Sequence, residues 1–175
     1  MTRPLRGEPL PIDLLNTTWR DEGVAHDALA DDDGLAEWLE EWSFDVPATD
    51  ATRAALVEAR GAVRGLLADR SAPAAVDAFN DILDRGRVRV ALADDGSVER
   101  TIDGVAPEWL PGVSAAHALV ELMETSGDRI RPCQHEECVL WFVDTSRNGT
   151  RRWCSMAVCG NRAKASRHYR RTHPA

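Results

Sequence analysis

Four cysteines, all in the last third of the chain, constrain its fold more than any other feature. Cys133 and Cys138 form one C-x4-C pair, and Cys154 and Cys159 form a second pair fifteen residues later. Two pairs of thiols, separated by enough chain for a small hairpin, are typical of a structural tetrathiolate zinc site. Four protein ligands leave no open position for water, so we expect structural Zn²⁺ and no hydrolytic zinc chemistry.

Two disulfides are the alternative pairing of the same residues. The chain begins Met1-Thr2-Arg3-Pro4 without an apolar signal segment, and no cysteine precedes Cys133. Both features argue against an oxidising compartment, so we expect a cytoplasmic protein with reduced thiols. His135 lies between the first two thiols and is a second candidate ligand, although four cysteines already complete the shell.

Charge is divided unequally along the chain. Residues 1–127 hold 11 Arg against 25 Asp and Glu, a balance of −14, whereas residues 128–175 hold 10 Arg and Lys against 4 acidic residues, a balance of +6. This asymmetry indicates an acidic body joined to a basic module that is attracted to phosphates. No apolar run approaches the roughly 18 residues of a membrane span, so we expect a soluble protein with no membrane partner.

The first 127 residues have mainly helical periodicity. Leu35, Trp38, Leu39 and Trp42 have the spacing of one helical face, and an acidic run that can cap the helix precedes them. The sequence predicts helices over 35–42, 49–68, 71–84 and 114–125. The segment 10–17 is either a short strand or a first helical turn. Alternating residues at 87–92 and 98–102, around an Asp-Asp-Gly turn, predict one hairpin.

The basic segment reads as a small metal module. A knuckle at the first cysteine pair is followed by a strand over 139–143, a turn over 144–149 and a returning strand over 150–154. A helix then runs from about Ser155 or Gly160 to Thr172, which is the treble-clef plan. We therefore expect an α+β fold, mainly α, with a helical domain over 1–127 and a metal-stabilised finger over 128–175.

These residues resemble a known family. The stretch 151–164 is similar to the signature of CGNR zinc fingers, which are named for the Cys-Gly-Asn-Arg found here at 159–162. Further matches to that finger are Cys133, Cys138, Phe142, Asp144, Ser146 and Arg147. In the family the finger follows an ABATE domain, whose opening motif resembles Leu14-Leu15-Asn16-Thr17 preceded by Asp13. The resemblance implies a transcription regulator that binds DNA through its finger.

Basic residues of the finger are the candidates for nucleic-acid contact. In a helix from 160 onward, Lys164, Arg167, His168 and Arg171 share one face, which could read a major groove. We expect Arg151 and Arg152 to meet phosphates. The full candidate set is Arg151, Arg152, Arg162, Lys164, Arg167, His168, Arg170 and Arg171. Because one finger makes a small interface, two half-sites and a homodimer are expected.

Several residues of the finger have a structural alternative to DNA contact. Asn161 and Arg162 suit the start of a helix, and Trp141 and Trp153 suit the finger core. A finger used for protein contact or dimerisation, through Trp141, Phe142 and the basic helix, is the alternative function. An enzymatic N-terminal domain is a third hypothesis, but we expect no enzyme, because nothing in that domain resembles a nucleophile elbow, a phosphate loop or a second metal cluster.

The acidic domain has weaker candidates for a small-molecule effector. Asp13, Asn16 and Thr17 carry polar groups that could bind one, although a buried cap or turn bond is the explanation that we favour. Trp38 and Trp42 have the spacing of core residues, with an aromatic wall for a ligand as the alternative. His117, on an apolar helix face, is either a core histidine or a site residue.

Overall fold

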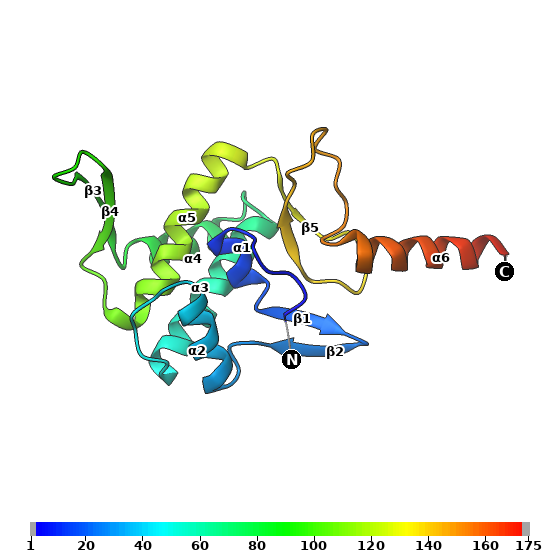
Figure 1. The fold of residues 1–175 in the computed structure, drawn as a ribbon, viewed down its shortest axis with the longest axis horizontal. Coiled ribbons are helices and arrows are strands. Elements are labelled where there is room, and N and C mark those ends of the chain that lie inside the picture. The colour runs from blue at the N-terminus through cyan, green and yellow to red at the C-terminus, as the bar shows by residue number, and fades with distance from the viewer. Residues whose placement is uncertain (1–2, 173–175) are drawn as a thin grey trace. The chain divides into compact units, whose positions relative to one another are not determined.

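The chain is mainly helical, with three two-stranded antiparallel sheets among the described residues (Figure 1). The structure is a computed structural model that describes residues 3–172, except for the side chains of 166–168 and 170–172. Its contacts divide the chain into two compact units: Met1–Asp27 with Met123–Ala175, and Ala28–Leu122. The first unit therefore combines the start of the chain with the cysteine-rich segment. In chain order the elements are α1 (Leu10–Leu15), β1 (Thr18–Asp21), β2 (Val24–Asp27), α2 (Asp32–Glu41), α3 (Asp50–Ala68), α4 (Pro73–Leu83), β3 (Arg87–Leu92), β4 (Val98–Asp103), a 3-10 turn (Pro107–Trp109), α5 (Leu110–Ser126), β5 (Ile130–Pro132), β6 (Trp141–Val143), a π turn (Met156–Gly160) and α6 (Asn161–Thr172).

The helices of the second unit begin where their capping residues predict. The Asp31 carboxylate accepts a 2.7 Å hydrogen bond from the Gly34 amide at the start of α2, and the Thr49 hydroxyl accepts one from Thr52 at the start of α3. Pro73 opens α4, where its missing N–H costs nothing. The four predicted helices are confirmed, with α2 and α5 beginning three and four residues earlier than expected. The segment 10–17 is helical at α1.

The core of the second unit includes the residues that the helical periodicity selected. Trp38, Leu56, Val63 and Ile82 are fully buried, and Trp38 stacks on Phe44 with 6.1 Å between ring centroids. His117 is partly buried, and its Nε2 lies 3.2 Å from the Gly86 carbonyl oxygen. Trp38 is thus a core residue and not the wall of a ligand site, and His117 is a hydrogen-bonded packing residue.

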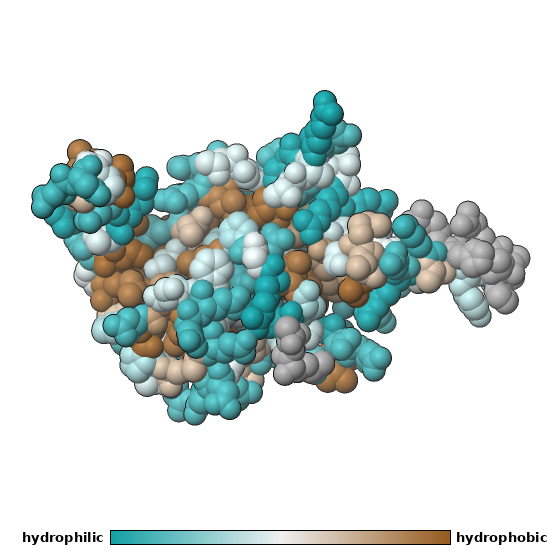
Figure 2. All heavy atoms as spheres, viewed as in Figure 1, coloured by the Kyte–Doolittle hydropathy of each residue, from teal (hydrophilic) through white to brown (hydrophobic). Residues whose placement is uncertain are grey.

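Two hairpins precede the finger, whereas the sequence predicted one. The predicted pair, β3 with β4, is confirmed, and Val90, Leu92 and Val98 on it are more than half exposed. Figure 2 shows hydrophobic residues on the surface where Figure 1 places this hairpin. The other pair, β1 with β2, turns at Glu22 and Gly23, which both have positive φ. Such a turn normally carries Asn-Gly or Asp-Gly, so glutamate hid the signal. The rings of Trp19 and His26 stack across this hairpin, with 5.2 Å between their centroids.

The strand pairing of the finger differs from the prediction. β6 pairs with β5, which precedes the first cysteine, and the segment 150–154 is not a strand. In that segment the Arg151 amide donates to the Asp144 carboxylate, and the Arg151 guanidinium donates to the carbonyl oxygens of Trp153 and Cys154. These side chains satisfy backbone groups that a returning strand would have paired. The helix prediction is confirmed, with a Ser155-capped π turn leading into α6.

No helix within the described residues is both long and apolar enough to cross a lipid bilayer.

Candidate metal centre

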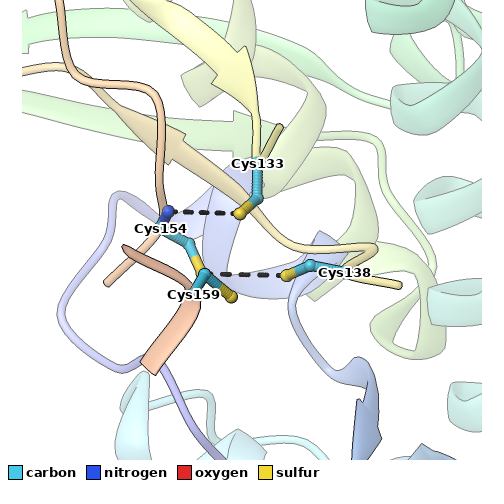
Figure 3. Close-up of side chains that lie close together, drawn as sticks. All are labelled: Cys133, Cys138, Cys154 and Cys159. Atoms are coloured by element: carbon cyan, nitrogen blue, oxygen red, sulfur yellow. Dashed lines mark hydrogen bonds between the residues drawn. The ribbon is translucent and has the colours of Figure 1, made fainter. Parts of the chain in front are cut away.

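The four cysteines come from three loops and one helical turn that the sequence brings together. Cys133 follows β5, Cys138 precedes β6, Cys154 ends the loop after β6, and Cys159 lies in the π turn. The Cys138 amide donates to the His135 carbonyl oxygen at 2.9 Å and closes the first knuckle. The Cys154 amide donates to the Cys133 sulfur at 3.4 Å, a bond that ties the two pairs together. The four side chains converge on one point (Figure 3).

The sulfur positions fit a tetrahedral metal ion. All four Sγ atoms lie within 4.8 Å of one another, with Cys138 to Cys154 at 3.7 Å and Cys154 to Cys159 at 3.6 Å. Zn–S bonds of about 2.3 Å in a tetrahedron separate the sulfurs by roughly 3.8 Å. A disulfide requires about 2.05 Å between its two sulfurs, and all four cysteines are free, so the alternative of two disulfides is wrong. Four thiolates arranged in this way hold one Zn²⁺.

His135 does not join this ligand set. Its Nδ1 accepts from the Glu137 amide at 3.4 Å, within the knuckle. The metal group formed by the described residues consists of Cys133, Cys138, Cys154 and Cys159.

Crowding of the thiols changes their ionisation strongly. The hydrogen bond from the Cys138 thiol lowers the pKa of Cys133 to about 2, and the same bond raises the pKa of Cys138 to about 12. Hydrogen bonds to Cys133 and Cys138 raise the pKa of Cys154, and burial raises the pKa of Cys159. One thiolate is therefore stabilised by protonated neighbours. Zn²⁺ binds thiolates, so its binding releases the protons of the remaining thiols.

Asp144 organises the loop that carries Cys154. Its buried carboxylate accepts from the Ser146 amide at 2.9 Å and from the Arg151 amide at 2.8 Å, and the Ser146 hydroxyl donates to it as well. Arg131 lies 3.8 Å from the same carboxylate. The hydrogen bond from the Ser146 hydroxyl is the main cause that lowers the pKa of Asp144. The ionised carboxylate thus fixes the path of the chain from β6 to the second cysteine pair.

We expect the stability of this loop to depend on acid pH through Asp144. Because folding lowers the pKa of Asp144, its carboxylate stabilises the folded state above the unfolded value of about 3.9. That contribution is lost as the pH falls from about 4 through the lower folded value. Asp144→Asn places an amide donor among N–H donors, so the variant should melt at a lower temperature at pH 7 and converge with the wild type toward pH 3. Thermal unfolding in excess zinc from pH 3 to 7 measures both curves, and bound zinc is measured at each pH because acid also protonates the thiolate ligands.

Asp128→Asn is the matched control for this measurement, because Asp128 is exposed in the same unit. It should follow the wild-type curve at every pH. A constant difference between wild type and Asp144→Asn from pH 3 to 7 would refute the assignment.

Arg151 and Arg152, which we predicted to meet phosphates, lie in different surroundings. The Arg151 guanidinium lies 4.4 Å from the centre of the Phe142 ring and donates to the carbonyl oxygens of Trp153 and Cys154. These contacts are all within the finger and stabilise its loop. Arg152 is exposed, and its Nε donates to the Gln134 side chain at 2.6 Å. Of the two, Arg152 is the more exposed, and its contact with phosphates stays a prediction.

The remaining basic candidates lie on or at the start of α6. Arg162 and Lys164 are exposed, and an Arg162 nitrogen lies 3.8 Å from the Asp21 carboxylate. The backbone at Arg167, His168, Arg170 and Arg171 is helical, but their side chains lie outside the described residues. Asn161 donates to the Ala157 carbonyl oxygen at 3.1 Å, so its role is structural. Trp141 and Phe142 are buried and Trp153 is partly buried, as expected of the finger core.

The three effector candidates are buried and internally bonded. Arg3 pairs with Asp13 at 2.7 Å, and the Thr17 hydroxyl donates to the Leu14 carbonyl oxygen at 2.7 Å. The Asn16 amide group donates to the Trp141 carbonyl oxygen and accepts from the Trp141 amide, both at 2.9 Å. Each of the three residues is 0% exposed. Asp13, Asn16 and Thr17 therefore fill the cap and bonding role, and none of them faces a surface that an effector could reach.

A pocket of about 240 Å³ lies elsewhere in the same unit, beside the cysteines. Its walls come from β1, the first knuckle and the start of the finger helix, and three of the zinc ligands, Cys138, Cys154 and Cys159, form part of them. The other lining residues include Trp19, Asp21, Leu140, Ser155, Val158 and Arg162. The sequence did not indicate this pocket, because the hairpin that contributes Trp19 was itself not predicted.

Glu8 is a further residue that sequence reasoning missed. Its carboxylate accepts a 2.9 Å hydrogen bond from the Val143 amide in β6, and burial raises the pKa of Glu8. No local pattern marks this role, since 135 residues separate the two partners.

Two family models match the chain. The CGNR zinc finger model matches residues 129–172, and the ABATE model, described as "Putative stress-induced transcription regulator", matches residues 8–126. No curated protein matches the chain.

Proposed function

Because this chain belongs to the family that joins an ABATE domain to a CGNR zinc finger, we propose that it regulates transcription by binding DNA through the finger. The observation that carries the proposal is a metal-held module with a balance of +6 at the end of a chain whose first 127 residues carry −14. A folded basic module is steered to phosphates, and the acidic remainder discourages binding elsewhere on the chain.

The roles of the basic side chains differ in this proposal. Arg152, Arg162 and Lys164 are exposed and supply the described part of the DNA-facing surface. Arg151 orders the loop that presents Arg152. Two copies on adjacent half-sites supply the affinity that one short helix lacks, so we propose a homodimer on DNA.

The experiment is binding of the zinc-loaded protein to a pool of random duplex DNA over a salt series. With about five phosphates contacted, the logarithm of the affinity should fall with the logarithm of salt at a slope of roughly −4 to −5. Lys164→Glu should weaken binding about tenfold or more and make the slope less steep, because it removes one phosphate contact and adds a repulsive charge. Fluorescence anisotropy measures both quantities.

Arg89→Glu is the matched control, since it makes the same change of charge at an exposed position on β3. It should leave DNA affinity within about threefold of the wild type. Equal losses for both variants would mean that net charge alone governs binding. Zinc-replete protein that binds no duplex even at low salt would overturn the proposal.

Protein contact through the finger is the second candidate. Met156 and Val158, on the π turn beside the metal ligands, are 54% and 43% exposed. Exposed apolar side chains next to a basic helix suit an acidic protein surface. In that case Lys164→Glu would change assembly, measured by light scattering, and would leave DNA binding unaffected.

Tuning by a small molecule is also part of the proposal. The pocket beside the cysteines supports it, because a ligand there would touch both β1 and the residues that lead into α6. Such a ligand could therefore shift the position of the finger helix.

A further inference from the structure

Strand β6 has two hydrogen-bonding edges, and only one of them is paired with a strand. On the paired edge, the backbone amide of Cys133 donates to the Leu140 carbonyl oxygen at 2.8 Å. The backbone amide of Asp144 donates to the Arg129 carbonyl oxygen, also at 2.8 Å. On the other edge lie the backbone groups of Trp141 and the amide of Val143. No strand within the described residues pairs with this outer edge.

Two side chains from the start of the chain occupy that outer edge. The Asn16 side chain makes both bonds to Trp141 that a residue of an adjacent antiparallel strand would make, each at 2.9 Å. The Glu8 carboxylate accepts from the next outward-facing amide, that of Val143, at 2.9 Å. Residues 8–16, called here the N-terminal clasp, therefore replace a third strand.

Burial makes these bonds difficult to lose. Asn16 is 0% exposed, and Trp141 and Val143 are both buried. If the N-terminal clasp leaves, buried N–H and C=O groups of β6 lose their partners, which is strongly unfavourable unless water can reach them. An exposed strand edge is also a site for unwanted pairing.

The same strand determines where two of the zinc ligands lie. Cys138 is three residues before Trp141, and Cys133 bonds directly to the Leu140 backbone. Cys133 and Cys138 can meet the second pair only while β5 and β6 keep their register. The N-terminal clasp thus bonds the outer edge of β6, and two metal ligands lie in the loop that joins β5 to β6.

We propose that the N-terminal clasp is a working part of the zinc module, and that its docking and zinc binding strengthen each other. Linkage requires this effect to be reciprocal: the clasp raises the affinity for zinc by the same factor by which zinc raises the occupancy of the clasp. A segment that the family models assign to the ABATE domain thereby controls the metal state of the finger. The coupling concerns metal binding and stands independently of what the finger contacts.

The first test is the zinc affinity of Asn16→Leu in the full chain. Leucine keeps the approximate size of asparagine but can make neither bond to Trp141. The loss of two buried hydrogen bonds should weaken zinc binding by about 10- to 100-fold, measured by competition with a chromogenic chelator at pH 7. Ile82→Ala, a buried deletion in α4 of the other unit, is the control for general destabilisation and should change the affinity less than threefold.

Glu8 provides a second pair of variants if Asn16→Leu does not fold. Glu8→Gln keeps an oxygen that can accept from Val143, so zinc affinity should stay within about threefold of the wild type. Glu8→Leu removes the acceptor and should weaken zinc binding about tenfold. Equal zinc affinity for the wild type, Glu8→Gln and Glu8→Leu would overturn the proposal.

The reciprocal effect is measured by amide hydrogen exchange in the wild type with and without chelator. Removing zinc should increase exchange at the amides of Ile12, Asp13 and Asn16 by at least tenfold, whereas amides in α4 should change little. Unchanged exchange across 10–16 after complete zinc removal would show that the clasp stays docked without metal, and the coupling would then be absent.

Discussion

Replacing Cys154 by serine is expected to abolish zinc binding and to unfold the finger. Cys154 is buried at the centre of the cluster, and its sulfur lies 3.7 Å from that of Cys138 and 3.6 Å from that of Cys159. A serine hydroxyl does not ionise near neutral pH and is a poor zinc ligand. Structural zinc sites contribute an apparent binding free energy of about 10–16 kcal/mol, comparable to or larger than the whole stability of a typical domain, about 5–15 kcal/mol.

Metal content by mass spectrometry and amide exchange across 129–165 measure this effect. The wild type should carry one zinc per chain and lose its slow-exchanging amides in β5 and β6 on chelation. Cys154→Ser should resemble the chelated wild type from the start. Ser155→Ala is the neighbouring control: it removes the hydroxyl that accepts from the Val158 amide at 3.4 Å and should cost only about 1 kcal/mol. A Cys154→Ser protein with one bound zinc and wild-type exchange would contradict the assignment.

The metal centre is the part of the molecule that the sequence predicts best. A structural zinc site requires four ligands, with the two thiols of each pair close enough in sequence to bind the same ion. Spacing alone therefore identifies the zinc ligands as Cys133, Cys138, Cys154 and Cys159. The helices of the acidic segment could also be predicted, because capping by Asp31 and Thr49 and the periodicity of apolar residues are local properties of the sequence.

The errors have two physical origins, which are weak local signals and bonding between residues far apart in the chain. The β1–β2 hairpin was missed because Glu22 replaces the usual turn residue. β5 was missed as the partner of β6 because a three-residue strand carries no periodicity. Asn16 had two interpretations, an effector contact and a buried cap or turn bond, and neither identified its partner Trp141, which is 125 positions away. No pattern near Asn16 encodes that contact.

The position of the division within the chain illustrates the same point. The change in charge suggests a boundary near 127, and the family models divide between 126 and 129. Spatial contacts instead group residues 1–27 with residues 123–175. A boundary in sequence therefore need not be a boundary in folding, because Glu8 and Asn16, on either side of α1, complete the hairpin of the finger through their side chains.

Phe142→Ala is expected to be the most destabilising change in the finger outside the zinc ligands. Phe142 is fully buried in β6, and the Arg151 guanidinium lies 4.4 Å from the centre of its ring. Deleting a buried phenylalanine ring typically costs about 3–5 kcal/mol, and the lost cation–π contact adds about 1 kcal/mol. For a chain of this size the melting temperature should fall by roughly 10 °C. Phe142→Leu, which refills most of the volume, should recover more than half of that loss.

Zinc affinity separates a specific effect of Phe142 from general destabilisation. Trp38→Ala is the matched control, since Trp38 is also almost completely buried and aromatic, but in α2 of the other unit. Both variants should lower the melting temperature by similar amounts. Only Phe142→Ala should weaken zinc binding by more than tenfold, because Phe142 packs in the strand that sets the position of Cys138, whereas Trp38 supports the helical core. If Trp38→Ala weakened zinc binding as much as Phe142→Ala does, zinc affinity would report the stability of the whole chain, and the strand would have no special link to the metal.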